Sequence, residues 1–331
     1  MLKIGVLGAG HLGKIHLKCL QMSEAYEVVG FYDPDEAQAR AASEQFGLRA
    51  WDSATALIEA VDVVDIVTPT VTHFKLAQLA IDKGKHLFIE KPITHTPEEA
   101  RDLLHASRAK GVRVQVGHVE RFNPAFLALD QVPLRPMFIE AHRLATFNPR
   151  GTDVSVILDL MIHDLDIVLS LVPSPVRHIS ASGVAVLSDT PDISNARIEF
   201  ENGCVANLTA SRMSLKQMRK VRLFQRDAYI SLDFLEKNAQ IVRMYDKASN
   251  PPQAEQMMEL PTPQGDKLIH IEMPTIEPTN AIKMELESLA TSIREQRPPK
   301  VGIEDGYRAL EVAYRILEEI ENRSRTYATQ A

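Results

Sequence analysis

Three ionisable side chains stand at helical spacing inside the segment VILDLMIHDLDIVLSLV, residues 156–172, which is otherwise apolar except for Asp164 and Ser170. They are Asp159, His163 and Asp166, four and three residues apart. On an α-helix these spacings bring side chains to one face. Buried charges are costly unless they are paired or functional. A histidine held by a carboxylate one turn earlier can serve as a general base, so we expect catalysis from this stripe.

Two other interpretations of the stripe remain open. A lone histidine on an apolar helix is more often a core residue with satisfied polar atoms than a catalyst. Histidine and aspartate are also metal ligands, but the segment has no His-x-x-x-His pair, and Cys19 and Cys204 are far apart without metal spacing. We therefore expect His163 to be the base, Asp159 to orient it, and no metal site.

A second candidate is Glu90-Lys91-Pro92, which follows the β-rich run of residues 85–89. Ligands bind beside the carboxyl ends of parallel strands, where this lysine would lie. A lysine there can stabilise negative charge developing on a substrate oxygen. The alternative is a solvated surface ion pair with Glu90.

A third candidate is the segment KIGVLGAGHLGKIH, in which Gly8, Gly10 and Gly13 form the G-x-G-x-x-G pattern. It follows a strand-like run and opens a helical one, the context in which this pattern binds a dinucleotide pyrophosphate. Asp33 stands twenty residues beyond Gly13, where an acid binds ribose hydroxyls. With no Arg or Lys beside Asp33 in the sequence, we expect NAD and disfavour NADP. A glycine turn that binds nothing is the alternative.

The elements that must position these residues divide at about residue 120. Residues 1–120 alternate strand-like runs, at 3–8, 27–33, 63–69, 85–92 and 112–118, with helical patterns. This alternation predicts an α/β, doubly wound domain with a parallel sheet. Its last helix is expected to start at Thr96 as N-cap with Pro97 at N1, and to end before Gly111.

Residues 121–331 have a different pattern. A helix at 153–172 precedes strand-like runs at 176–187, 195–211, 220–234 and 239–245, with a hairpin turn at 201–203. A long loop over 247–278 with one short strand leads to helices at 279–296 and 304–324. We expect an α+β substrate-binding and oligomerisation domain with a large, mainly antiparallel open sheet, whose closing helices can pack on the first domain.

Composition limits the class of protein. The chain has 331 residues and a net charge of -7, which argues against nucleic-acid partners. We expect no membrane span, because no run of about 18 uncharged apolar residues exists. The start of the chain lacks the pattern of a signal peptide, and with only two cysteines we expect a cytoplasmic protein.

These motifs together resemble the Gfo/Idh/MocA family of NAD(P)-dependent sugar oxidoreductases. The glycine loop, Glu90-Lys91-Pro92, Asp159-x-x-x-His163-x-x-Asp166 and the closing helices carry the resemblance along the whole chain. Met161 stands where the family commonly has glycine, which suggests a subgroup with its own pocket. The resemblance implies that His163 removes a hydroxyl proton as hydride leaves for the nicotinamide, assisted by Lys91. It also implies a homodimer or homotetramer formed through the second-domain sheet.

The resemblance also implies residue sets around the two ligands. The cofactor would be bound by Gly8, Gly10, His11, Leu12, Gly13, Asp33, Thr68, Pro69, Thr70, His73, Glu90 and Lys91. The substrate would be bound by His118, Arg121, Asn123, Arg143, Arg150 and Asp166.

The segments at 116–126, 147–166 and 210–224 resemble a subgroup of UDP-N-acetylglucosamine 3-dehydrogenases. A nucleotide diphosphate needs cations, and Arg212, Lys216 and Arg219 add to the arginines above, although a solvated basic hairpin remains an alternative for 212–222. Two rival functions stay open. One is a dehydrogenase of a free polyol such as an inositol, and the other is a non-catalytic NAD-binding regulator.

Overall fold

The structure, a computed structural model, describes residues 1–148, 154–247 and 257–328, with side chains as far as Arg323 in the last range. The chain forms two compact units. The first combines Met1–Phe122 with Thr279–Glu311, and the second combines Asn123–Pro278 with Val312–Ala331.

The first unit contains a five-stranded parallel sheet in the order β2-β1-β3-β4-β5. Its strands are β1 (Leu2–Leu7), β2 (Tyr26–Tyr32), β3 (Val63–Ile66), β4 (His86–Glu90) and β5 (Val114–Gly117). Its helical segments are α1 (His11–Gln21), α2 (Glu36–Phe46), α3 (Ala54–Ala60), η1 (Thr70–Thr72), α4 (His73–Asp82), α5 (Pro97–Lys110), η2 (Val119–Phe122) and α8 (Ala281–Arg294). The predicted doubly wound domain is confirmed, and α3 is a helix that the sequence pattern did not predict.

Helices cover both faces of this sheet because its strands are apolar on both sides. On one face Ile4 and Val6 pack with α1, α2 and α8. On the other face the backbone of Gly5 lies against Leu57 of α3. The last helix of the alternating segment has the predicted ends: Thr96 caps it with Glu99, Pro97 is at N1, and Gly111 follows in a left-handed conformation, φ 67°.

The second unit contains a nine-stranded sheet in the order β13-β14-β12-β11-β10-β6-β9-β8-β7. Its strands are β6 (Phe138–Leu144), β7 (Val176–Val184), β8 (Ile193–Phe200), β9 (Val205–Ser211), β10 (Met218–Phe224), β11 (Ala228–Asp233), β12 (Asn238–Asp246), β13 (Met257–Leu260) and β14 (Lys267–Glu272). Its helical segments are α6 (Pro124–Leu127), η3 (Ile157–Met161) and α7 (Ile162–Leu171), and α9 (Ile303–Ala328) enters it at Val312.

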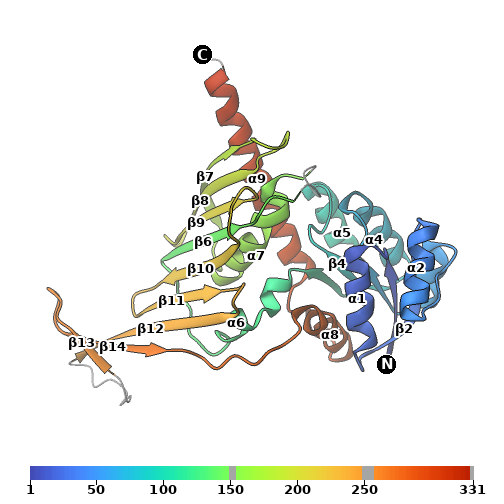
Figure 1. Cartoon of the computed structure of the whole chain (residues 1–331), viewed down its shortest axis with the longest axis horizontal. Helices are drawn as coiled ribbons and strands as arrows, with labels where there is room; N and C mark the ends of the chain where they lie inside the picture. Colours follow the sequence, from blue (N-terminus) through green and yellow to red (C-terminus); the bar gives the residue numbers. More distant parts are fainter. Residues whose placement is uncertain (149–153, 248–256, 329–331) are drawn as a thin grey trace. The chain divides into compact units, whose positions relative to one another are not determined.

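The sheet is mainly antiparallel, as predicted, and the hairpin turn at 201–203 joins β8 to β9. Two strands were not predicted: the short edge strand β13 and the central strand β6, which pairs antiparallel with β10 and parallel with β9. Strand β6 alternates buried and partly exposed residues, so its sequence FIEAHRL carries a period-two pattern. The ionisable stripe lies on η3, which contacts β9, and on α7, which contacts β6 (Figure 1 shows α7 beside this sheet).

Candidate active site

The glycine loop turns tightly between β1 and α1. Gly8 has a φ of +99°, and its N–H donates to the carbonyl of Tyr32 at 2.8 Å. A Cβ at Gly13 would overlap the carbonyl oxygen of Gly8, so only glycine lets α1 begin this close to the strand. Gly10 precedes α1 and offers no side-chain cap, which leaves the first N–H groups of the helix available to an anion.

Beside this loop lies a cavity of about 760 Å³. It is lined by Leu7, Gly8, Gly10, His11, Leu12, Tyr32, Asp33, Pro34, Asp35, Gln38, Val67, Thr68, Pro69, Thr72, Lys75 and Leu76. A Cβ at Gly10 would meet only Gln38 Oε1, at 3.8 Å, so the backbone there is open to an approaching ligand. The size, the open backbone and the helix N-terminus fit the pyrophosphate and ribose of a dinucleotide.

Asp33 follows β2, lines this cavity and is hydrogen-bonded to the glycine loop. Its Oδ2 accepts the Ala9 N–H at 2.7 Å and its Oδ1 accepts the Asp35 N–H at 2.9 Å. These bonds fix the carboxylate where it can bind a ribose hydroxyl. Lys75 of α4 lines the same cavity. The sequence around Asp33 could not reveal this cation, because it is 42 residues away and only the parallel sheet brings α4 close.

The segment from Thr68 to His73 is divided between the cavity and the core. Thr68 and Pro69 line the cavity, and Thr70 begins η1. His73 is only 1% exposed, and its ring nitrogens lie 3.0 Å from the Pro92 carbonyl and 2.8 Å from the Thr68 carbonyl. It thus connects the cofactor loop to the turn that carries Lys91, a positioning role that fits its burial.

Lys91 follows β4 directly and is partly exposed, as a residue at a carboxyl strand end should be. Its backbone N–H donates to Glu90 Oε2 at 3.0 Å. Two further predicted residues, His118 and Arg121, lie after β5 in the same unit and are 1% and 9% exposed. Burial, together with the charges of Arg121 and Lys91, lowers the pKa of His118 to about 3. His118 is therefore a neutral imidazole.

Asn123 has a structural position at the start of α6. Its Oδ1 accepts the Ala125 N–H at 3.1 Å as the helix N-cap, and its Nδ2 donates to the Phe234 carbonyl at 3.0 Å. The side chain is 7% exposed.

The ionisable stripe differs from the predicted single α-helix. Asp159 lies in η3, a π-helical turn, and His163 lies in the first turn of α7. The Ile162 N–H bonds back to Ile157, which widens the turn by one residue, a feature frequent at functional sites. Asp159 and His163 are partly exposed, whereas Asp166 is 2% exposed. Apolar periodicity alone could not distinguish this turn from a regular α-turn.

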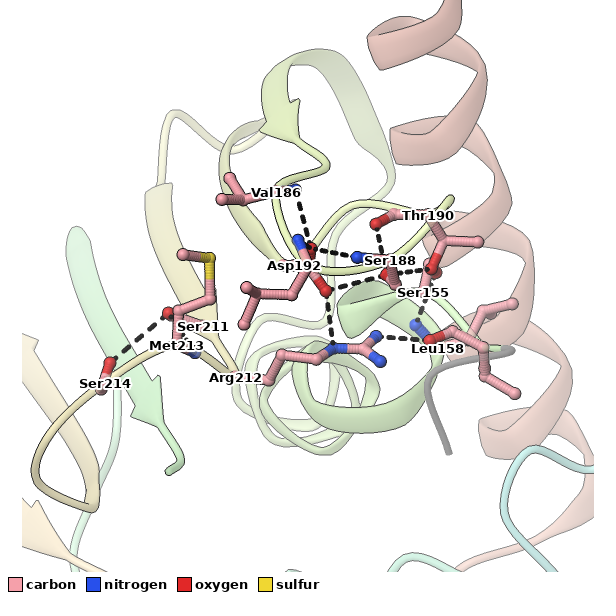
Figure 2. A network of polar contacts seen from close by, with 12 residues as sticks. Ser155, Leu158, Val186, Ser188, Thr190, Asp192, Ser211, Arg212, Met213 and Ser214 are labelled. Carbon is pink, nitrogen blue, oxygen red and sulfur yellow. Dashed lines mark hydrogen bonds and ion pairs between the residues drawn. The ribbon is translucent and has the colours of Figure 1, made fainter. Parts of the chain in front are cut away.

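A buried network secures the chain as it enters the stripe (Figure 2). Arg212 donates to the Val154 carbonyl, and its Nε lies 3.6 Å from Asp192 Oδ1. Asp192 Oδ2 accepts three backbone N–H groups, those of Val186, Leu187 and Ser188. The Leu158 N–H is bonded to Ser155 Oγ at 3.4 Å. Arg212 thus helps to position the segment that carries Asp159.

The other predicted cations have varied surroundings. Arg143 is 3% exposed and forms a two-pronged pair with Asp164. Arg150 lies outside the described residues. Lys216 and Arg219 are exposed near the start of β10.

Comparison with known proteins agrees with these features. Residues 2–118 match the family described as oxidoreductase family, NAD-binding Rossmann fold, and residues 137–229 match the GFO/IDH/MocA C-terminal domain. UDP-N-acetylglucosamine 3-dehydrogenase of Acidithiobacillus ferrooxidans is 34% identical over 321 residues, 97% of each chain. A solved structure of that enzyme covers 97% of this chain and 98% of its own, with a TM-score of 0.87.

An inositol dehydrogenase is a more partial relative. scyllo-Inositol 2-dehydrogenase (NAD(+)) of Bacillus subtilis is 29% identical over 64% of this chain and 68% of its own. In the described part of the chain, no helix combines the length and the apolar character that crossing a bilayer requires. The matches to both domains and over nearly the full length show that this chain is an NAD-binding oxidoreductase of the Gfo/Idh/MocA family.

Proposed function

We propose that this enzyme oxidises the 3-hydroxyl of UDP-N-acetylglucosamine to a 3-keto sugar, with NAD as the cofactor. The observation that carries the proposal is the 34% identity to the Acidithiobacillus enzyme over 97% of both chains. The inositol dehydrogenase matches 64% of this chain at 29% identity, so its similarity covers a smaller part of the molecule.

The chain supplies the groups that such an oxidation needs. Bound NAD provides the hydride acceptor. His163 takes the proton from the reacting hydroxyl, because a neutral imidazole is the side chain best suited to a proton transfer near neutral pH. Asp159 orients the imidazole, and Lys91 stabilises the charge that develops on the substrate oxygen. Each of these three roles is tested by substituting the residue that carries it.

The cofactor residues follow from the cavity. We propose that the α1 N-terminus behind Gly10 binds the pyrophosphate and that Asp33 accepts a ribose hydroxyl. His11, Leu12, Thr68 and Pro69 complete the walls. Thr70, His73 and Glu90 also contribute to cofactor binding in this proposal, His73 and Glu90 as buried residues. We propose NAD in preference to NADP because a 2′-phosphate would be repelled by Asp33.

The diphosphate of the substrate needs cationic partners. We propose Lys216 and Arg219 for this role, because both side chains are exposed whereas Arg212 and Arg143 are in buried ion pairs. His118, Arg121, Arg150 and Asp166 remain proposed contacts to the sugar and its phosphates. The paired replacement Lys216→Ala and Arg219→Ala should raise KM for the sugar nucleotide by about tenfold or more and leave KM for NAD unchanged.

The direct test is a panel of UDP-sugars and free polyols with NAD, followed by NADH absorbance. Reduction of NAD with UDP-N-acetylglucosamine, and analysis of the product as the 3-keto sugar, is the expected result. Turnover confined to inositols would assign the polyol activity instead. Binding of NADH with no hydride transfer to any substrate would favour a regulator.

We further propose a homodimer or homotetramer formed through the second-unit sheet. A polar depression of about 420 Å³ on this sheet is lined by residues that include Glu140, His142, Asn195, Arg197 and Asn207. Such a face suits a self-complementary polar interface. Sedimentation of the native protein and of Arg197→Glu should show the larger and the smaller species respectively. A cytoplasmic location is also proposed, in keeping with the free thiols of Cys19 and Cys204.

A further inference from the structure

Four ionisable side chains from four elements meet in the core of the first unit. They are His16 of α1, Asp65 of β3, Glu90 of β4 and Glu285 of α8, and their exposed fractions are 0%, 0%, 8% and 0%. His16 Nδ1 lies 3.0 Å from Asp65 Oδ2, and His16 Nε2 lies 3.2 Å from Glu90 Oε1. Three carboxylates and one imidazole would be a strongly negative group to bury.

The carboxylate of Glu285 is the least satisfied member of this group in the part of the chain that the structure describes. Both of its oxygens are buried, and neither has a hydrogen-bond partner among the described residues. His16 Nε2 also has no hydrogen bond there, although Glu90 is close. The two Glu285 oxygens and His16 Nε2 are therefore buried polar groups that a bound cation would satisfy.

The spacing of the groups favours a cation. One donor atom from each of His16, Glu90 and Glu285 lies within 4.8 Å of the other two. A shared proton needs two heavy atoms within about 3 Å in line, which Glu285 does not achieve. A metal ion binds each ligand at about 2.0–2.2 Å, so its ligands stand roughly 3–4 Å from one another. The 3.2 Å between His16 Nε2 and Glu90 Oε1 matches neighbouring ligands of one ion.

Asp65 contacts the ring nitrogen of His16 that is not among the proposed ligand atoms. It lies against His16 Nδ1 at 3.0 Å, and in the neutral tautomer that has its proton on this nitrogen the Nε2 lone pair is left for a metal ion beside Glu90 and Glu285. Metal-binding histidines commonly have such a carboxylate on the other ring nitrogen. We propose that His16, Glu90 and Glu285 bind one divalent cation of the zinc class. A nitrogen ligand with two carboxylates suits Zn²⁺ better than Mg²⁺ or Ca²⁺.

The cation would be structural. It would link the helix after the glycine loop, the strand that precedes Lys91, and the closing helix α8. Glu90 is the shared point, because its other oxygen accepts the Lys91 N–H. Residues at positions 16, 90 and 285 have no metal-like spacing in the sequence, so only the fold brings the three ligands together.

The test is the metal content of the intact protein. The protein is produced in medium supplemented with zinc and dialysed against metal-free buffer. Its metal content is then measured by inductively coupled plasma mass spectrometry after acid digestion. We expect about one zinc ion per chain in the native protein and at least a tenfold lower content in Glu285→Gln. Glu287→Gln is the matched control, because Glu287 is on the same helix but pairs with Lys283 and Ser23.

A second measurement does not depend on a variant. Protein produced with Co²⁺ should show visible absorption bands of a four- or five-coordinate ion with nitrogen and oxygen ligands. Absence of stoichiometric metal from the native protein in both preparations would overturn the proposal and leave a proton or a buried water in the site. Equal zinc in the native protein and Glu285→Gln would overturn it as well.

Discussion

The guanidinium of Arg143 meets the carboxylate of Asp164 in two parallel hydrogen bonds, Nε to Oδ2 at 2.9 Å and Nη2 to Oδ1 at 2.8 Å. The side chains are 4% and 3% exposed, so the pair joins β6 to α7 inside the second unit. Asp164 is thus a member of the acidic run around His163 that pairs with a buried arginine and so has a structural role.

Replacing Asp164 with Asn should destabilise the protein strongly. The change leaves a buried guanidinium without its counter-charge, which costs about 3–5 kcal/mol in unfolding free energy. Urea unfolding measures this loss, and Glu59→Gln, which breaks the exposed pair with Lys83, should change little. An unaltered unfolding curve together with a raised KM for the sugar nucleotide would show that Arg143 serves the substrate instead.

The native protein should bind NADH more tightly than NADPH. Asp33 is held by the Ala9 and Asp35 N–H groups, so it cannot easily turn away from a 2′-phosphate. Fluorescence titration with both cofactors measures the preference. Asp33→Ser should narrow it, and adding Lys75→Ala to that variant should weaken NADPH again, because Lys75 lines the same cavity. Equal affinities in the native protein would contradict the assignment of Asp33.

Lys91→Ala should keep cofactor binding and lose turnover. Lys91 is not among the residues that line the cavity beside the glycine loop, so titration with NADH should be almost unchanged. Turnover should fall by about 10² or more, the usual loss for a positioned charge or proton-transfer group. Near-native turnover would make Lys91 an ordinary surface charge.

His163→Asn should fold, bind NADH and lose about 10²–10⁴ in turnover. Sugar oxidation by the native enzyme should rise with pH as the general base loses its proton. Asp159→Asn should lose less turnover than His163→Asn if Asp159 only orients His163. It should lose a similar amount of turnover if the two residues act as one unit. A purely structural histidine would give the reverse pattern, a lower Tm with unchanged activity per folded molecule.

Asp192 should make the free energy of unfolding fall more steeply as the pH is lowered into the acid range. Burial alone would raise its pKa, but hydrogen bonds from the backbone of Leu187, Val186 and Ser188 outweigh burial and lower the pKa to about 2. The unfolded value is about 3.9. Asp192 therefore stabilises the fold above about pH 4, and this contribution disappears as the pH falls toward about 2.

The measurement for Asp192 is the free energy of unfolding as a function of pH. Asp192→Asn should be less stable than the native protein at neutral pH, and the difference should shrink below about pH 4. Asp189→Asn, an exposed change three residues earlier, is the control and should keep the native profile. A constant difference at all pH values would contradict the role given to the Asp192 charge.

The sequence pattern predicted the structural features that depend on residues close together in the chain. The glycine loop, the Thr96 cap of α5 and the turn before β9 each follow from residues a few positions apart. Features that depend on distant pairing were missed. Strand β6 is held by β9 and β10, and its own seven residues resemble many irregular segments.

The candidate site shows the same division. The positions of Gly8, Asp33 and Lys91 follow from strand ends, which the alternation of elements locates. The π-turn at Asp159 and the buried pairs of Arg143 and Arg212 could not be read from spacing. The sequence alone does not show whether an arginine contacts solvent, a phosphate or a buried aspartate, because its partner depends on the fold.

The place of α8 in the first unit has a consequence for synthesis. Leu286, Leu289 and Ala290 of this helix fill the same core as Leu17 and Leu20 of α1. About 160 residues of the second unit are translated between η2 and α8, which takes roughly 8–32 s at usual elongation rates. During that interval the nascent cofactor domain presents an uncovered apolar face, so the growing chain should be a client of chaperones until its last helices emerge.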